Sequence, residues 1–467
     1  MTLVSPYYWV FLTIVLVCYY NIPSKLRWKF LLLSSIVFYI SIAPIFIIFI
    51  IYQSLIIFFF CRLIIKVKNK KFKKYTFFIG VFLSLSPLLF FKSIPLWFET
   101  YNNLSPNPLI FEKFKLFFPL GISFFTFTGL GYLIDVYNEK LLFVNDFRKI
   151  FLFISFFPIV LSGPIERGKF IDQLIKPSYF RVKNLITGFE LILWGTFMKL
   201  VLADNIDLLI GPILDSPKEQ TGISVLFSIL IYPFQVYGDL GGYTLVAIGS
   251  AKCLDIDVRK NFNHPFSATS MTDFWRRWHI SLIEWINDYI FKPINFYLRN
   301  LKKYAIVIAL TSTFLIAGIW HKVSLGFIIW GLIQSTILII EFLFKNKSKS
   351  KNIILVVFYK RISTYLMFAF SLIFGGAVAN YDDSIIVLKK ISSFDSGLMF
   401  DLRLLIICII SILVILLKDS FEIRKTLFNI KNKYFSKSIK WSIYYIIILS
   451  ILFFGVFKNQ NFIYFQY

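Results

Sequence analysis

The sequence is poor in charged residues, histidine and cysteine. Only 16% of its 467 residues are Asp, Glu, Lys or Arg, and the chain has three histidines and four cysteines. Soluble globular domains are about a quarter charged, so this shortage argues against an ordinary soluble protein. The cysteines, at 18, 61, 253 and 408, have neither metal-site nor redox spacing. We therefore expect buried thiols and predict no metal site.

Apolar residues are abundant and are gathered into long runs. They make up 58% of the chain, and about 18 consecutive apolar residues can cross the hydrocarbon of a membrane. The pattern predicts an all-α polytopic membrane protein. Segment 150–162 carries Pro158 and is too short to cross, so we expect it to be re-entrant. The predicted spans, about a dozen, are 6–24, 30–46, 47–61, 76–92, 117–137, 185–203, 223–250, 304–320, 324–344, 362–380, 404–417 and 441–457.

Basic residues outnumber acidic ones, 50 to 25, and give a formal net charge of +25. They lie in short loops between apolar runs, and this is typical of cytoplasmic loops in membrane proteins. The rule places loops 66–74, 345–351 and 251–303 in the cytoplasm and both termini outside. The sequence offers no soluble basic domain, so nucleic-acid binding is not expected. The first apolar run begins at Tyr7 without a basic region before it, and we interpret it as a retained span.

The segment FWRRWHISLIEWINDYIF, 274–291, stands out in the large cytoplasmic stretch. Phe274, Trp278, Leu282 and Trp285 recur along one face of a helix. The spacing predicts a single amphipathic helix that lies at the membrane interface or dips into it. Its tryptophans are then membrane anchors, and its arginines face lipid phosphate.

The same segment also has a functional interpretation. Arg276 and Arg277 are suited to hold a phosphate-bearing donor, because guanidinium binds phosphate in a bidentate manner. His279 then lies at the inner mouth of a site and points toward its outer end. The alternative is that His279 only satisfies a carboxylate such as Glu284 or Asp273.

His321 is the second candidate, in AGIWHK at 317–322. It ends an apolar run that begins inside at Lys303, so it lies at depth or toward the outer side. An ionisable residue in a span is a functional candidate, because burying it in lipid is costly. The alternative is a hydrogen-bonded histidine in an aromatic belt with Trp320. The two histidines at opposite ends of one path suit a group transfer in which a histidine takes the proton of a hydroxyl that attacks a thioester.

Asp239 is a carboxylate inside an apolar run, in YPFQVYGDLGGYTLVAIG at 232–249. The glycines around it permit a broken helix or close helix packing. For Asp239 itself we favour a structural, hydrogen-bonded role.

Seven stretches together carry a resemblance to a known family. The chain resembles the membrane-bound O-acyltransferase family and, within it, the bacterial alginate O-acetylation branch. The WRRWHISL block with a WH pair further along the chain is the most specific feature. The matching stretches are PLGISFFTFTGLGYLIDVY (119–137), FFPIVLSGPIER (156–167), WGTFMKLVLADNID (194–207), YPFQVYGDLGGYTLVAIG (232–249), NFNHPFSATSMTDFWRRWHISLIEWINDYIFKPI (261–294), GIWHKVSLGFIIWGLIQS (318–335) and FIYFQY (462–467).

The resemblance implies a fold and a set of site residues. It implies one membrane-embedded domain over 1–467, a ring of helices with re-entrant pieces around a central tunnel. Residues 117–467 carry the motifs, and 1–116 match only in hydropathy. It implies His321 as the catalytic histidine and His279 as the second essential one. Arg276, Arg277, Trp275 and Trp278 become donor-binding candidates, and Asp239, Tyr243, Trp320 and Asp273 become tunnel or support residues.

The resemblance also implies an activity. It is transfer of an acyl group, most often acetyl, from acetyl-CoA or another thioester substrate to an envelope polysaccharide such as alginate. No bound cofactor is expected. Expected partners are the lipid bilayer and a periplasmic acetyltransferase, and the expected location is the bacterial inner membrane. The alternatives are peptidoglycan O-acetylation, D-alanyl transfer to teichoic acid, or a non-enzymatic acyl-group transporter, against which the absence of two related halves counts.

Three positions depart from the usual pattern of the family. They are Lys322 in place of glycine, Leu245 in place of an acidic residue, and His264 in place of arginine. These departures bear on the acceptor more than on the reaction class.

Overall fold

The described chain is built from helices joined by loops and turns. The computed structural model describes residues 2–105, 119–344, 354–393, 395–397, 400–427 and 437–457, and no strand occurs in those ranges. The basic stretch 345–351 and the terminal FIYFQY at 462–467 lie outside them. The all-α class expected from the sequence is confirmed.

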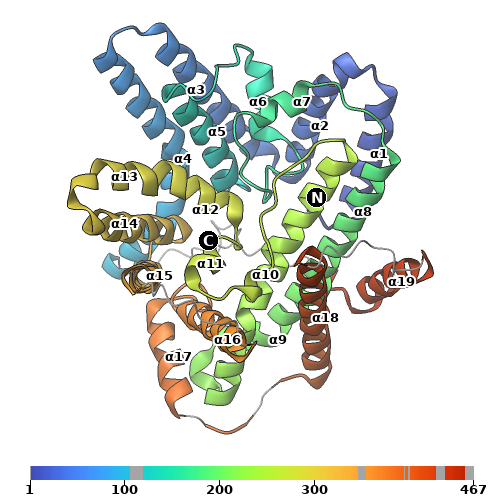
Figure 1. Ribbon diagram of the computed structural model, residues 1–467, viewed down its shortest axis with the longest axis vertical. Helices are drawn as coiled ribbons and strands as arrows, with labels where there is room; N and C mark the ends of the chain where they lie inside the picture. Colours follow the sequence, from blue (N-terminus) through green and yellow to red (C-terminus); the bar gives the residue numbers. More distant parts are fainter. Residues whose placement is uncertain are drawn as a thin grey trace. The chain divides into compact units, whose positions relative to one another are not determined.

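The α-helices follow one another along the chain (Figure 1). Those of the first half are α1 (Pro6–Asn21), α2 (Arg27–Ile42), α3 (Ile47–Lys66), α4 (Lys70–Leu104), α5 (Ile122–Tyr137), α6 (Phe147–Ser155), α7 (Phe170–Ile175), α8 (Val182–Phe197), α9 (Asp204–Asp215) and α10 (Gly222–Cys253). Those of the second half are α11 (Met271–Trp275), α12 (Ile280–Ile286), α13 (Lys292–Tyr297), α14 (Lys303–His321), α15 (Leu325–Leu343), α16 (Ile354–Ser371), α17 (Tyr381–Ser393), α18 (Leu402–Leu427) and α19 (Lys437–Phe454).

Seven helices within the described ranges are long and apolar enough to cross a membrane. They are Pro44–Lys66, Lys70–Asn102, Val182–Asp215, Gly222–Cys253, Lys303–His321, Leu325–Leu343 and Leu402–Ile423. The segments Ile122–Tyr137 and Ile439–Phe454 are apolar but shorter. The polytopic membrane class is therefore confirmed, with fewer full-length spans than the dozen predicted from hydropathy. The expected span 362–380 is wrong at its end, because α16 stops at Ser371 and turns follow it.

The segment expected to be re-entrant is a short helix followed by turns. Helix α6 ends at Ser155, the chain then turns through Pro158, and every residue of 150–162 is buried. A proline at that place cannot donate the hydrogen bond that would continue the helix. The stretch therefore does not form a span of its own, as its length predicted.

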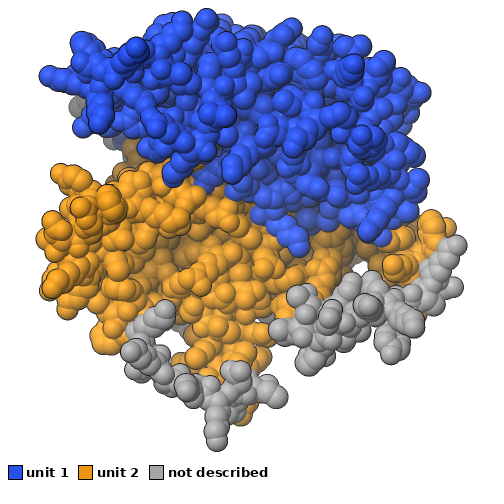
Figure 2. All heavy atoms as spheres, turned by 45° about the horizontal axis from the view of Figure 1, so that its top comes forward, with its two compact units in different colours: residues 1–192, 243–260, 464–467 blue, residues 193–242, 261–463 orange. Residues whose placement is uncertain are grey.

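The chain divides into two compact units (Figure 2). Among the described residues, 2–192 and 243–260 form unit 1, and 193–242 together with those from 261 to 457 form unit 2. The single domain and the ring around a tunnel stay predictions. All candidate site residues except Tyr243 belong to unit 2.

Helices α14 and α15 form an antiparallel hairpin in unit 2. Their backbones approach closely at two glycines. A Cβ atom on Gly318 would lie 2.3 Å from the carbonyl oxygen of Phe327, and one on Gly331 would lie 2.5 Å from that of Phe314. Small residues at such crossings let apolar helices associate in lipid, where the hydrophobic effect between helices is absent. The hairpin fixes the position of His321 at the end of α14.

The predicted amphipathic helix over 274–291 is wrong. The chain forms α11, breaks at 276–279, and continues as α12 and a π-helix, η8 (Asn287–Phe291), before α13. His279 has φ 44° and ψ 50°, the left-handed conformation, and this ends one helix and starts the next. The break is held by Asn261, whose carbonyl accepts the N–H of Ile280 at 2.8 Å and whose side-chain oxygen accepts the N–H of Ser281 at 3.1 Å.

The apolar face of this segment is buried in protein. Phe274, Trp278, Leu282 and Trp285 are each at most 4% exposed. The prediction that the tryptophans anchor the segment at the membrane interface is therefore corrected, because their rings pack against other side chains. Trp278 stacks on Phe274 with ring centroids 5.3 Å apart and contacts Phe368 at 5.0 Å.

Candidate functional site

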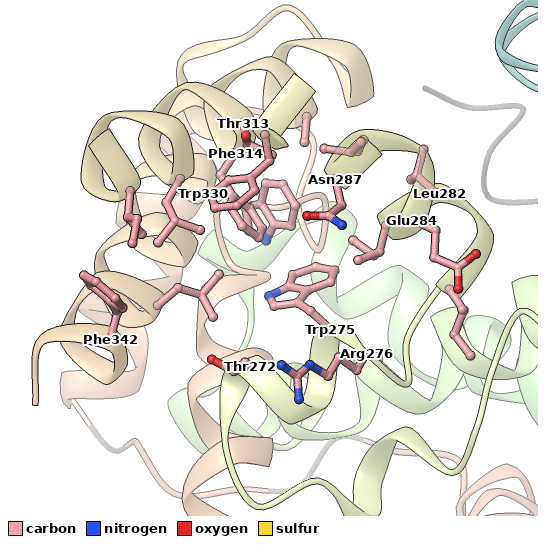
Figure 3. A pocket seen from close by; sticks show the side chains of 18 of the residues that line it. Thr272, Trp275, Arg276, Leu282, Glu284, Asn287, Thr313, Phe314, Trp330 and Phe342 are labelled. Carbon is pink, nitrogen blue, oxygen red and sulfur yellow. The ribbon is translucent and has the colours of Figure 1, made fainter. Parts of the chain in front are cut away.

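Unit 2 contains a cavity of about 480 Å³ between the broken segment and the α14–α15 hairpin (Figure 3). This volume is within the range of small-molecule binding sites, roughly 300–1,000 Å³. Most of the lining is apolar, with a few polar groups. Its lining includes Thr272, Trp275, Arg276, Glu284 and Asn287 from the broken segment, and Ile306, Leu310, Thr313, Phe314, Ala317, His321, Trp330, Leu338 and Phe342 from the hairpin.

One face of α14 lines the cavity for most of the length of the helix. The lining positions run from Ile306 to His321 at steps of three or four residues, with Thr313 and Phe314 adjacent, as expected for a single helical face. At 1.5 Å per residue these positions span about 22 Å. On α15 the lining runs the opposite way, from Trp330 to Phe342. The cavity is therefore elongated along the hairpin, with His321 at one end and Phe342 at the other.

His321 is the last residue of α14 and is partly buried among aromatic rings. Its imidazole lies edge-on to the indole of Trp330, with centroids 5.5 Å apart, and stacks near Phe327 at 5.7 Å. The structure thus places this predicted catalytic residue in the wall of the cavity. Aromatic walls limit water, and a general base benefits from such surroundings.

The end of the cavity away from His321 is polar. Arg276 lines it with an exposed side chain, and Figure 3 shows its guanidinium close to Thr272. Glu341 on α15 fixes this end. Its carboxylate accepts the N–H of Met271 at 2.6 Å, the N–H of Thr272 at 2.9 Å and the hydroxyl of Thr272 at 2.7 Å. The sequence interpretation missed Glu341, although a lone carboxylate in the apolar run 325–344 was a signal for it.

Trp275 also lines the cavity, and a hydrogen bond to Gln334 fixes its indole. Its Nε1–H donates to the side-chain oxygen of Gln334 at 3.2 Å, and the amide nitrogen of Gln334 donates to Ser371 at 2.7 Å. Gln334 is fully buried. The chain of hydrogen bonds satisfies each buried polar group and sets the angle at which the indole faces the cavity.

The other two predicted donor-binding residues lie outside the lining. Trp278 is part of the aromatic core described above. Arg277 donates from Nε to Asp273 at 2.8 Å and from its terminal nitrogen to Ser267 at 3.3 Å. Asp273 is in turn the partner of this arginine, so both residues hold the turn before α12. Of the four predicted donor-binding residues, Trp275 and Arg276 face the cavity.

His279 is buried at 2% exposure and does not line the cavity. Its neighbours Ile280 and Leu282 do. Burial lowers the pKa of His279 to about 3, because the charged imidazolium is disfavoured without water. The imidazole is therefore neutral at neutral pH. Its predicted role as the second essential histidine stays a prediction.

Asp239 belongs to a buried ion cluster that the sequence interpretation did not find. The ammonium of Lys199 lies 2.5 Å from Asp239 and 2.7 Å from Asp204, and all three side chains are at most 4% exposed. Lys199 sits in a π-helix, η5 (Met198–Ala203), between α8 and α9. The charged residues within WGTFMKLVLADNID were the available signal. Asp207 accepts from Gln235 at 2.7 Å nearby.

Two support residues remain, Tyr243 and Trp320, together with two of the three departures from the family pattern, Lys322 and His264. Tyr243 is 1% exposed and Trp320 is partly buried. Lys322 donates to the carbonyl of Ala379 at 2.9 Å, so its ammonium is held beyond the end of α14. His264 lies 3.1 Å from the carboxylate of Asp419 on α18.

Comparison with known proteins gives a consistent match. The model of the membrane-bound O-acyltransferase family matches residues 140–376. The chain is 30% identical over 290 residues to a peptidoglycan O-acetyltransferase of Helicobacter pylori, covering 56% of this chain and 54% of that protein. It is 30% identical over 267 residues to the probable alginate O-acetylase AlgI of Pseudomonas aeruginosa, covering 56% and 50%. It is 27% identical over 267 residues to a teichoic acid D-alanyltransferase of Bacillus subtilis, covering 56% and 66%. The chain thus matches about half the length of the first two of these relatives.

Proposed function

Because this chain belongs to the membrane-bound O-acyltransferase family, we propose that it transfers an acyl group from a thioester to a hydroxyl of an envelope polysaccharide. One observation carries the proposal. A single elongated cavity has His321 at one end and Arg276 at the other. That arrangement suits a reaction whose two substrates arrive from opposite ends, with the reacting centre beside the histidine.

His321 is the general base of the proposed reaction. Its imidazole takes the proton of the acceptor hydroxyl as the oxygen attacks the thioester carbonyl, and it returns the proton to the leaving sulfur. Histidine suits both steps because its usual pKa is close to neutral. The surrounding rings of Phe327 and Trp330 hold the imidazole in one orientation.

The donor enters at the Arg276 end. Arg276 is exposed at the cavity mouth, and a guanidinium binds phosphate groups such as those of coenzyme A. Beyond it, the indole of Trp275 and the apolar faces of α14 and α15 accommodate the thioester arm. The donor is acetyl-CoA or another acyl thioester. In this proposal the Arg276 end faces the cytoplasmic side of the bacterial inner membrane, and the positive charge of the neighbouring loops supports that orientation.

The acceptor is a polysaccharide of the cell envelope, and alginate-like O-acetylation is the first candidate. It rests on the several alginate O-acetylases among the relatives. A peptidoglycan O-acetyltransferase is matched with the same identity, so peptidoglycan is the second candidate. D-alanyl transfer to teichoic acid is the third, through the relatives named for it. For the first two candidates, alginate-like and peptidoglycan O-acetylation, we expect a periplasmic acetyltransferase as partner.

The test compares envelope glycans from cells with and without the gene. Mass spectrometry of purified polysaccharide and peptidoglycan detects each added acyl group by mass and identifies its carrier. We expect acylated product to disappear with the gene and to return with the wild-type chain but not with His321→Ala at equal membrane abundance. Unchanged acylation in the His321→Ala strain would overturn the catalytic assignment. Loss of D-alanine in place of acetyl would select the third acceptor.

A further inference from the structure

Trp330 has a buried indole N–H with no hydrogen-bond partner among the described residues. Its side chain is only 5% exposed, and it lines the same cavity as His321. A donor buried without an acceptor is unfavourable, and native structures rarely keep one without a reason. A ligand that brings an acceptor into the cavity would satisfy it.

The hydroxyl of Thr313 on the hairpin wall already has an acceptor within the protein. Thr313 donates its hydroxyl to the carbonyl of Ala309 at 2.6 Å. Trp275, on the facing wall, donates its indole N–H to Gln334 at 3.2 Å. Trp330 therefore differs from a tryptophan in the same cavity whose donor has an acceptor within the protein.

The indole of Trp330 is fixed on three sides. The ring of Trp275 meets it edge-on at 6.1 Å, and the ring of Phe314 lies 6.4 Å away. A Cβ atom on Gly375 would approach its five-membered ring to 2.4 Å, so only glycine leaves room for the indole there. Figure 3 shows the indole nitrogen on the side of the ring that faces Trp275, across the lined space. A donor held in this way needs no reorganisation when charge develops beside it.

We propose that the Nε1–H of Trp330 donates a hydrogen bond to the acyl carbonyl oxygen and stabilises the negative charge that forms on it during transfer. The inference rests on the proposed function. The imidazole of His321 and the indole of Trp330 lie with their centroids 5.5 Å apart. The oxygen of a carbonyl group attacked beside His321 is therefore within reach of the indole N–H.

The step is balanced as follows. The acceptor oxygen forms a bond to the carbonyl carbon while its proton moves to the imidazole of His321. The carbonyl electron pair moves onto oxygen, where the indole N–H of Trp330 stabilises it. The pair then reforms the carbonyl as the carbon–sulfur bond breaks, and the imidazolium gives its proton to the leaving thiolate. The products are the ester and a free thiol.

The test is Trp330→Phe in the full-length protein reconstituted in liposomes. Phenylalanine keeps an aromatic ring at the site and removes the donor. With acetyl-CoA as the probe, release of free thiol is measured in the absence of acceptor, since this hydrolysis develops the same charge. We expect kcat to fall roughly 100- to 1,000-fold, as for loss of one oxyanion donor, with little change in KM for acetyl-CoA. Envelope acetylation in cells should fall in parallel.

The matched control is Trp441→Phe, which changes a tryptophan on α19 that is 52% exposed and is not part of the lining. It should keep wild-type kcat. Trp330→His, which retains a ring N–H, is the second variant and should recover part of the activity that Trp330→Phe loses. If Trp330→Phe does not accumulate as a folded protein, the activity of Trp330→His relative to wild type tests the inference in its place.

Three outcomes overturn the inference. A folded Trp330→Phe protein with kcat within about threefold of wild type shows that the N–H does not stabilise the transition state. A rise in KM with unchanged kcat assigns Trp330 to donor binding instead. If thiol release falls equally in Trp330→Phe and Trp330→His, the loss comes from the smaller ring and not from the missing N–H donor. If wild type releases no thiol and acylates no envelope glycan, the proposed function fails first, and that result is distinct from all three.

Discussion

The buried cluster around Lys199 gives a prediction with a definite magnitude. Lys199→Met removes the ammonium and leaves the carboxylates of Asp204 and Asp239 in a site where both are about 4% exposed. Both oxygens contact the same ammonium, at 2.7 and 2.5 Å, so they lie at most about 5 Å from each other. Two unit charges at that separation repel by about 3 kcal/mol when the effective dielectric constant is about 20.

Breaking a buried ion pair by removing one partner generally costs about 3–5 kcal/mol. We expect Lys199→Met to lower the free energy of unfolding by about that amount. The assay is unfolding of the purified protein by increasing mole fraction of denaturing detergent in mixed micelles, followed by tryptophan fluorescence. The exposed Lys218→Met is the matched control, and it should change the free energy of unfolding by less than about 0.5 kcal/mol.

A triple variant tests the electrostatic cause. Lys199→Met combined with Asp204→Asn and Asp239→Asn removes all three charges and keeps the side-chain volumes similar. We expect it to recover most of the stability that the single variant loses, because no buried carboxylate is left without its cation. A triple variant as unstable as Lys199→Met would refute the reasoning, and so would a single variant with wild-type stability.

Four further predictions follow from the site. Arg276→Gln should raise KM for acetyl-CoA about tenfold or more with little loss of folded protein. Arg277→Gln should instead mainly lower the free energy of unfolding, by up to about 1 kcal/mol, because it removes the cation paired with the partly exposed carboxylate of Asp273; initial rates and melting curves separate the two. Glu341→Gln should lower kcat/KM by weakening the carboxylate clamp on the N–H groups of Met271 and Thr272, measured by the same thiol-release assay. Gly331→Ala should separate α14 from α15, since its Cβ would lie 2.5 Å from a carbonyl oxygen, and should remove activity at normal membrane abundance, which immunoblotting checks. The neutral His279 predicts an acid-sensitive fold, because its imidazole takes a proton below about pH 6.5 in the unfolded chain but only near pH 3 in the folded one. The free energy of unfolding therefore falls as the pH drops through this window, by up to ~1.4 kcal/mol per pH unit. The variant His279→Gln should flatten the decline measured between pH 6.5 and 5.

Hydropathy predicted the location of the helices well and their ends poorly. Each of the dozen expected spans coincides with a helix among the described residues, since long apolar runs have few alternatives in lipid. The end of the span 362–380 was wrong, because α16 stops at Ser371, although the Gly375-Gly376 pair that follows was an available signal for a turn. Helix ends depend on turn geometry and packing partners that a hydropathy window does not register.

The site was predictable where single residues carry the signal. A histidine at the end of an apolar span was sufficient to select His321, which lines the cavity. The break at His279 was not predictable, because it depends on hydrogen bonds that Ile280 and Ser281 donate to Asn261, eighteen residues before His279 and without any local mark of that role. The helical spacing of four apolar residues was real but misleading, since burial in a broken segment yields the same pattern. Trp330 was hidden for a related reason, because an unsatisfied donor is visible only when its surroundings are known.

The π-helix around Lys199 has a consequence for how the protein is made. A lysine or an aspartate near the middle of a helix costs about 2.5–3.5 kcal/mol on insertion into the membrane. Lys199 and Asp204 stand five residues apart in one continuous helical stretch, and the wide π-turn brings side chains at that spacing together.

Their ion pair therefore needs no other helix. It can form while the segment is leaving the ribosome and entering the bilayer, before Asp239 has been translated. We expect the segment to enter lipid with its two charges already paired, and Asp239 then to bind the buried ammonium of Lys199. The π-turn thus pairs the charges of Lys199 and Asp204 within one helix, and Asp239, later in the chain, adds a second carboxylate to the same ammonium.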